Sequence, residues 1–187
     1  MNVIIFGPPG AGKGTQSQNI VKKFKLFQIS TGNLLRSEIK NKTSIGKEIE
    51  EIISKGDFAT DDIVNKLIKN VIFDPQKKNN LIFDGYPRSL SQAKNLDLLL
   101  ESSNQKIDYI FFLNVNKDII IKRIEKRKIL ENRSDDDTET ILKRYDTYMH
   151  VTKPVLDFYS SRSNFYEIEG SNEIEAISGK IAQILKV

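Results

Sequence analysis

The sequence predicts an α/β protein with three layers, in which helices cover both faces of a central, parallel, five-stranded sheet. Two observations favour this class. Short apolar runs alternate with segments of helical periodicity, and a glycine-rich loop follows the first apolar run. Strands that are separated by helices pair in parallel through right-handed crossovers. The length of 187 residues suits one compact domain.

The five expected strands are short and rich in apolar residues. The run 2–6 ("NVIIF") ends at a glycine and predicts a buried strand, and 81–84 ("LIFD") and 109–115 ("YIFFLNV") have the same form. The run 27–29 and the run 164–169 complete the set.

Helices are expected between these runs and after the last one. Apolar residues at helical spacing mark a first helix from Lys13 to about Phe24, and a stripe of isoleucines from Ile174 to Ile184 marks the last one. Further helices are expected at 31–40, 45–55, 60–73, 90–101, 118–127 and 137–160. Proline has no N–H to continue a helix, so the segment 137–160 is expected to be disturbed at Pro154.

The composition excludes several classes of site. The chain has no cysteine and a single histidine, which excludes disulfides, Cys-ligated zinc and a histidine-rich metal site. The net charge of +4 is mild and does not by itself indicate a nucleic-acid partner. No signal peptide is recognisable, and no apolar stretch approaches the ~20 residues that span a bilayer. We therefore expect a cytoplasmic protein without nucleic-acid or membrane partners.

The stretch "GPPGAGKGT" (7–15) has the form of a phosphate-binding loop, or P-loop. Glycines let the backbone approach a polyphosphate, and successive N–H groups then form an anion-binding nest. The helix that starts near Lys13 adds the positive end of its dipole, and the lysine adds a full charge. Gly14 stands where Ser or Thr usually follows the lysine. The residues of the loop that are expected to bind the phosphates of a nucleotide are Gly10, Ala11, Gly12, Lys13, Gly14 and Thr15.

Further motifs, taken in order, resemble one enzyme family. "GPPGAGKGT", "ISTGNLLR" (29–36) and "FDGYPRS" (83–89) together resemble the nucleoside monophosphate kinases, and most closely the adenylate kinases among them. "NRSDDDTETILKRYDTY" (132–148) continues the resemblance, which extends over the whole chain. It implies reversible Mg²⁺-dependent phosphoryl transfer from ATP to AMP, giving two ADP. The UMP/CMP kinases share the short lid and are the alternative; Thr31 with Gln92 favours AMP.

The resemblance implies an acceptor site. Thr31, Arg36 and Arg88 would hold the acceptor phosphate, and Gln92 would pair with adenine, since a carboxamide offers both a donor and an acceptor. The full set implied for AMP is Thr31, Arg36, Asp57, Phe58, Ala59, Gly85, Tyr86, Arg88, Gln92, Arg133 and Arg144. Two departures from the family pattern stand here: Asn33 replaces the usual Asp, and Phe58-Ala59 replaces a common Leu-Val pair.

The donor and catalytic residues follow from the same resemblance. Arg123, Arg127 and Asn172 would contact ATP, and Asp84 would orient the waters around Mg²⁺. Phosphoryl transfer needs several cations around one centre, and arginine suits this with its planar fork of donors. The residues implied for catalysis are Lys13, Arg88, Arg123, Arg133 and Arg144.

The resemblance also divides the chain into a core (1–29, 60–126 and 138–187), an arm that binds the monophosphate (30–59) and a short lid (127–137). Long-lid relatives carry a much larger insert, some with a zinc site, so no zinc is expected here. Adjacent carboxylates such as "SDDD" (134–137) cannot all converge on one ion. They favour a turn that caps the following helix, and the family adds a hinge role. A monomer is also implied.

A nucleotide-dependent switch without transfer is the rival from another class. Such GTPases read guanine with Asn-Lys-x-Asp, but the nearest stretch, "NKDI" (116–119), lacks the final Asp. A switch would also have no use for the arginines of "DGYPR" and of the lid.

Overall fold

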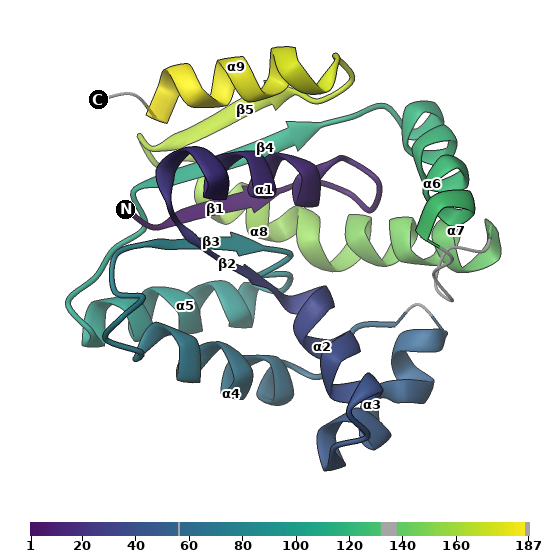
Figure 1. Ribbon diagram of the computed structural model, residues 1–187, viewed down its shortest axis with the longest axis horizontal. Helices are drawn as coiled ribbons and strands as arrows, with labels where there is room; N and C mark the ends of the chain where they lie inside the picture. The colour runs from purple at the N-terminus through teal and green to yellow at the C-terminus, as the bar shows by residue number, and fades with distance from the viewer. Residues whose placement is uncertain (56, 132–137, 186–187) are drawn as a thin grey trace.

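The computed structural model describes residues 1–55, 57–131 and 138–185, and its centre is an all-parallel sheet of five strands (Figure 1). The strand order is β2-β3-β1-β4-β5. The strands are β1 (Val3–Phe6), β2 (Phe27–Ser30), β3 (Leu81–Asp84), β4 (Tyr109–Asn114) and β5 (Phe165–Glu169). All five match the expected runs, and the predicted fold class is confirmed.

Helices lie on both faces of the sheet (Figure 1). They are α1 (Lys13–Phe24), α2 (Thr31–Lys40), α3 (Ser44–Ser54), α4 (Asp61–Ile72), α5 (Leu90–Ser102), α6 (Lys117–Glu131), α7 (Thr138–Thr147), α8 (Lys153–Ser160) and α9 (Ile174–Leu185). A π-helical turn (Tyr148–Thr152) joins α7 to α8. Within the described ranges, no helix is both long and apolar enough to cross a lipid bilayer.

Alternating side chains of β1 hold the two layers together. Ile4 and Phe6 face a core built with α4, α5 and α8, whereas Val3 and Ile5 face a second core built with α1, α6 and α9. All four are at most 3% exposed. Successive strand residues point to opposite faces, so an uninterrupted apolar run is what a strand covered on both faces requires. This double burial fixes the carboxyl end of β1, where the glycine-rich loop begins.

The functional segments gather at the carboxyl edge of the sheet. In the parallel register Ser30 pairs with Asp84, and both end their strands. The loop after β1, the start of α2 and the segment after β3 therefore leave the sheet at the same edge. Ligands of open α/β sheets bind in this position.

Two helical segments can be compared closely with the expectation. The helix expected to end at residue 127 continues to Glu131, because "KILE" consists of residues with good helix propensity. The expected disturbance of 137–160 is confirmed as the π-helical turn that ends just before Pro154. Proline cannot donate the usual backbone bond, and the wider turn accommodates the missing donor.

The helices α2 and α3 project beyond the sheet as a pair (Figure 1) and pack very closely against each other. A Cβ atom on Gly46 of α3 would lie 2.0 Å from the carbonyl oxygen of Glu38 in α2. Only glycine fits at this contact. Thr43 caps α3 by accepting a hydrogen bond from the Gly46 N–H at 2.9 Å.

Candidate active site

Glycines shape the loop between β1 and α1. Gly10 and Gly12 have positive φ angles of 80° and 92°, which side-chain-bearing residues rarely adopt. A Cβ on Gly10 would also lie 2.7 Å from the side chain of Ile124 in α6. Gly12 caps α1, so the first helical residue is Lys13. The free N–H groups of this turn and the helix dipole together favour an anion.

The ammonium group of Lys13 donates to carbonyl oxygens of its own loop. Nζ lies 2.6 Å from the oxygen of Gly7 and 2.9 Å from that of Pro8. Ala11 is buried in the same loop, and the Thr15 side chain is exposed in the first turn of α1. Two backbone oxygens of the loop are thus the partners of the Lys13 ammonium group.

Burial lowers the pKa of Lys13 from 10.5 to about 7. The negative charge of Asp84 opposes this shift, whereas the positive charges of Arg88, Arg144 and Arg127 reinforce it. The lysine retains partial exposure, yet its charged group is surrounded by protein atoms and by like charges. Segments far apart in the sequence therefore contribute to one centre of positive charge.

Arg123 of α6 ties the glycine-rich loop to the loop after β5. Its guanidinium donates to the backbone oxygens of Ala11 (3.3 Å), Gly170 (2.8 Å) and Asn172 (3.4 Å). Arg127 lies one turn further along the same helix and is half-buried. The structure thus brings the three expected donor-side residues Arg123, Arg127 and Asn172 to the neighbourhood of the loop.

Asp84 ends β3 beside the first turn of α1. It is 9% exposed, and its Oδ2 accepts a hydrogen bond from Nε2 of Gln28 at 3.0 Å. A Cβ on Gly14 would lie 3.7 Å from this oxygen. Across residues 1–55, 57–131 and 138–185, no three Asp, Glu or His side chains gather as a metal-binding cluster.

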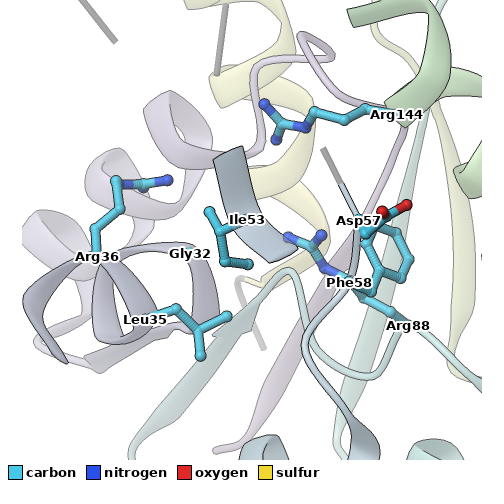
Figure 2. Close-up of a pocket in the computed structure, with 8 residues that line it drawn as sticks. All are labelled: Gly32, Leu35, Arg36, Ile53, Asp57, Phe58, Arg88 and Arg144. Carbon is cyan, nitrogen blue, oxygen red and sulfur yellow. The ribbon is translucent and has the colours of Figure 1, made fainter. Parts of the chain in front are cut away.

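A pocket on the acceptor side is lined by three arginines from different elements (Figure 2). Its lining residues are Gly32, Leu35, Arg36, Ile53, Asp57, Phe58, Arg88 and Arg144. The guanidinium of Arg88 stacks over the Phe58 ring, 4.6 Å from its centroid, and its Nε donates to the carbonyl oxygen of Gly85 at 2.8 Å. Thr31 donates to the same oxygen from its hydroxyl at 2.7 Å.

Arg36 is held by a neighbour on its own helix. Its NH2 donates to Oδ1 of Asn33 at 2.6 Å. Asn33 thus supplies the oxygen for which the family usually has a carboxylate, but without the charge. Because the asparagine is neutral, its hydrogen bond to Arg36 is weaker than the ion pair that a carboxylate would form at this position.

Gln92 makes hydrogen bonds within the protein through both ends of its carboxamide. Oε1 accepts from the backbone N–H of Arg88 at 2.7 Å, and Nε2 donates to Oδ1 of Asp61 at 2.7 Å. Gln92 is 3% exposed. Tyr86 lies deeper, where its hydroxyl donates to Oδ1 of Asn65 at 2.8 Å and burial raises its pKa to about 12. Tyr86 therefore packs in the core and does not line the pocket of Figure 2.

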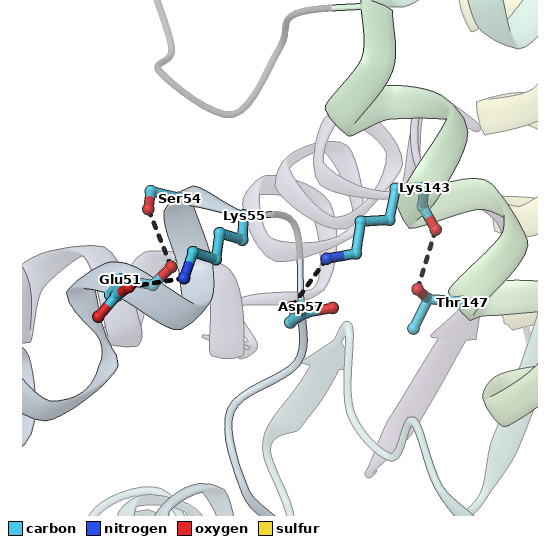
Figure 3. A network of polar contacts seen from close by, with 6 residues as sticks. All are labelled: Glu51, Ser54, Lys55, Asp57, Lys143 and Thr147. Atoms are coloured by element: carbon cyan, nitrogen blue, oxygen red, sulfur yellow. Dashed lines mark hydrogen bonds and ion pairs between the residues drawn. The ribbon is translucent and has the colours of Figure 1, made fainter.

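An ion pair joins the arm to the helix that carries Arg144. Nζ of Lys143 in α7 lies 2.8 Å from Oδ2 of Asp57 (Figure 3). The side chains are 47% and 44% exposed. On the arm side, Lys55 forms a second pair with Glu51, at 2.6 Å. The segment before α4 and the segment after the lid are thus in contact.

The remaining expected residues are placed as follows. Ala59 is buried next to Phe58 and belongs to the core. Arg133 and the stretch 134–137 lie outside the described residues. Sequence reasoning missed several side-chain partners of site residues, among them Gln28, Asp61, Asn65 and Lys143. Only Asp61 carries a local signal, an acidic residue in the first turn of a helix, and that signal predicts helix stabilisation and no more.

Comparisons with known proteins agree with this geometry. The family model described as "Adenylate kinase" matches residues 5–164. A protein from Pelagibacter ubique is 50% identical over 213 residues, with 100% of both chains covered. One from Azobacteroides pseudotrichonymphae is 40% identical over 183 residues, covering 98% of this chain and 96% of the relative. A third, from Nocardioides, is 34% identical, with 100% and 98% covered.

All three relatives carry the name adenylate kinase, so the UMP/CMP kinase alternative is not favoured. The rival interpretation as a switch has no support either, because the matched family consists of phosphotransferases. A glycine-rich loop, a second pocket with three arginines and a family match over most of the chain lead to one conclusion: the chain belongs to the adenylate kinase family of nucleoside monophosphate kinases.

Proposed function

We propose that the chain transfers the γ-phosphoryl group of ATP to AMP, giving two ADP, with the site residues in the roles described below. One observation carries the proposal. Arg88 and Arg144 line the acceptor pocket and also lie close enough to Lys13 to lower its pKa. The donor loop and the acceptor pocket therefore share one cluster of positive charge, as transfer between two bound nucleotides requires.

On the donor side, backbone N–H groups of residues 10–15 would bind the β- and γ-phosphates. Lys13 would exchange the carbonyl oxygens of Gly7 and Pro8 for phosphate oxygens and then follow the moving phosphoryl group. Arg123 and Arg127 would flank ATP from α6, with Asn172 beside them. The contacts of Arg123 to Ala11 and Gly170 hold the loop in the shape that the phosphates need.

On the acceptor side, Arg36 and Arg88 would bind the phosphate of AMP. For this, Thr31 turns its hydroxyl from Gly85 to the phosphate, and Arg88 leaves the ring of Phe58. Gln92 would contact the adenine, next to the segment 57–59. Two arginines that hold one phosphate dianion orient its oxygen for in-line attack on the γ-phosphorus.

The residues around Asp84 fit a magnesium ion bound through water. A single, nearly buried carboxylate beside the first turn of α1 can orient coordinated waters, and Gln28 fixes its rotamer. When bound with ATP, Mg²⁺ neutralises charge on the β- and γ-oxygens. The negative charge that develops during transfer would be stabilised by Lys13, Arg88, Arg123, Arg144 and Arg133.

Closure of the arm (30–59) and the lid (127–137) would exclude water, because premature hydrolysis would destroy the donor. The ion pair between Asp57 and Lys143 supports this proposal, because it links the segment before α4 to α7. We further propose that the enzyme works as a monomer in the cytoplasm.

The test is a panel of acceptors. ADP formation from ATP is followed with AMP, UMP, CMP and GMP at equal concentrations, with and without Mg²⁺. We expect AMP to give the highest kcat/KM of the four acceptors, and we expect ADP formation to require Mg²⁺. Faster turnover of UMP or CMP than of AMP would overturn the acceptor assignment. ATP hydrolysis that no acceptor accelerates would overturn transfer itself.

A further inference from the structure

The carboxamide of Gln92 is held by two partners of opposite kind. The backbone N–H of Arg88 can only donate, so at 2.7 Å it requires the oxygen of the amide. The carboxylate of Asp61 can only accept, so at 2.7 Å it requires the nitrogen. A flipped amide would place N–H against N–H and oxygen against carboxylate. The two partners therefore select one of the two orientations.

Asp61 is itself fixed. It is the first residue of α4, and its other oxygen, Oδ2, accepts from the hydroxyl of Ser89 at 2.8 Å. Ser89 caps α5 by accepting from the N–H of Gln92 at 3.1 Å. The Asp61 carboxylate thus connects the start of α4 to the start of α5, where it contacts both Ser89 and the amide of Gln92. Its charge also makes the contact to Nε2 stronger than a neutral hydrogen bond.

The orientation of an amide decides which purine edge it can match. Adenine presents an amino donor next to a ring acceptor, whereas a 6-oxopurine presents an oxygen next to a ring N–H. If the amide flips, its donor and its acceptor change places, and the preferred base changes from the 6-aminopurine to the 6-oxopurine. The mismatched base would leave two buried polar groups unpaired. An amide that could flip freely would accept both.

We propose that Asp61 determines the acceptor specificity of the enzyme, by fixing the amide of Gln92 in the orientation that matches a 6-aminopurine and rejects a 6-oxopurine. This rests on the proposed contact between Gln92 and the acceptor base. Asp61 is a positioning residue: it acts on the substrate only through Gln92. The free lone pair of Oε1 and the second N–H of Nε2 are the groups that remain for the base.

The experiment compares AMP with IMP, which differ only in this edge of the base. Initial rates are measured for the wild type and for Asp61→Asn, Asp62→Asn and Gln92→Ala, each with saturating ATP and varied acceptor. An asparagine can donate or accept, so residue 61 no longer opposes the flipped amide, and only the N–H of Arg88 still favours the original orientation. Asp62 is the matched control, because it is the next residue of the same helical turn and is exposed.

We expect Asp61→Asn to lower the AMP/IMP ratio of kcat/KM by roughly tenfold, the scale of one net hydrogen bond. The change should arise from a higher KM for AMP and a lower KM for IMP, with the KM for ATP unchanged. Asp62→Asn should leave the ratio as in the wild type. If the role of Asp61 were purely structural, Asp61→Asn would lower the midpoint of thermal unfolding and would reduce kcat/KM for AMP and for IMP by the same factor.

The outcomes separate the two levels of the proposal. If Gln92→Ala lowers the ratio and Asp61→Asn does not, Gln92 contacts the base but Asp61 does not orient it, and the inference fails alone. If Gln92→Ala leaves the ratio unchanged, the proposed contact between Gln92 and the base fails as well. Should Asp61→Asn not fold, Asp61→Ser, which keeps a helix-compatible hydroxyl, is measured in its place with the same expected fall.

Discussion

The donor loop and the acceptor pocket hold their charged groups in different ways. At the loop, Lys13 and Arg123 donate to backbone carbonyl oxygens of residues nearby in space. In the acceptor pocket, side chains also hold one another: Arg36 is held by Asn33 and Asp57 by Lys143, whereas Arg88 stacks on Phe58 and donates to the backbone oxygen of Gly85.

This difference has a functional reason. Backbone oxygens are fixed by the fold, so the donor groups are preorganised and cost little to hold in place. Side-chain pairs can exchange one partner for a ligand, so the acceptor groups can move when AMP arrives. The donor site is thus expected to respond to substitutions mainly through kcat, and the acceptor site mainly through the KM for AMP.

The largest effect is expected at the donor loop. Lys13→Met should lower kcat by about 10²–10³-fold, the usual cost of removing one preorganised stabilising group. The fold should persist, because the methionine fills a similar volume. A coupled assay of ADP formation measures kcat, and Lys22→Met, an exposed lysine of the same helix, is the control. Activity of Lys13→Met above half that of the wild type would contradict the role of Lys13.

The next effect is expected at the acceptor pocket. Arg88→Lys loses the donation from Nε to Gly85 and the planar fork of donors proposed to bind the phosphate of AMP, so kcat/KM for AMP should fall about 10- to 100-fold. The KM for ATP should stay constant. Arg162→Lys is the matched control, since Arg162 also stacks on aromatic rings but far from the pocket, next to Asp97. An equal fall of kcat/KM for ATP and for AMP would contradict the distinction between the donor site and the acceptor site.

A smaller effect concerns protons. Because the pKa of Lys13 is about 7 without nucleotide, the lysine is mostly neutral at pH 8, and bound phosphates should charge it. Binding of ATP at pH 8 should take up about 0.9 proton, measured by calorimetry in buffers of different ionisation enthalpy. Lys13→Met should take up no proton at this position when ATP binds. Proton release by the wild type would contradict the lowered pKa of Lys13.

The same shift in the pKa of Lys13 makes the stability of the fold depend on pH. Between about pH 7 and 10.5 the unfolded chain binds more protons at Lys13 than the folded chain does. The contribution of this residue to the free energy of unfolding therefore increases with pH across that window and is unfavourable below it. Comparing urea midpoints of the wild type and of Lys13→Met at pH 6.5 and 9 isolates this contribution.

The smallest effect is expected for the pair of Asp57 and Lys143. Both side chains are nearly half exposed, so a double-mutant cycle with Asp57→Asn and Lys143→Met should give a coupling energy below about 1 kcal/mol. The coupling should vanish in 1 M salt, where the Debye length is about 3 Å. A coupling energy above about 2 kcal/mol that does not change with salt would contradict the view that this ion pair is weaker than the contacts of the donor loop.

Local patterns were sufficient to predict the sheet and the donor loop. The run at Val3–Phe6, the glycines and Lys13 lie within a few residues of one another, so their geometry is encoded in one short segment. The end of α6 at Glu131 was harder to predict, because a helix that continues through good helix formers leaves no stop signal.

The side-chain partners of the site residues outside the glycine-rich loop could not be predicted in this way. Gln92 and Asp61 are 31 residues apart, Gln28 and Asp84 are 56 apart, and Asp57 and Lys143 are 86 apart. Each pair depends on how the crossovers return separate segments to the same edge of the sheet. The family resemblance identified Gln92 and Asp84 as site residues, but their partners follow only from the three-dimensional structure.

The close contact at Gly46 has a mechanical consequence. Since no atom can be inserted between Gly46 and the backbone of Glu38, α2 and α3 cannot slide past each other without losing that contact. In the closure proposed above, the pair would travel as one rigid body. Bending would then be confined to the two ends of the arm, where it joins β2 and α4. Arg36 would move with that body while Arg88 stayed with the sheet, so the proposed closure would change the distance between the two guanidinium groups.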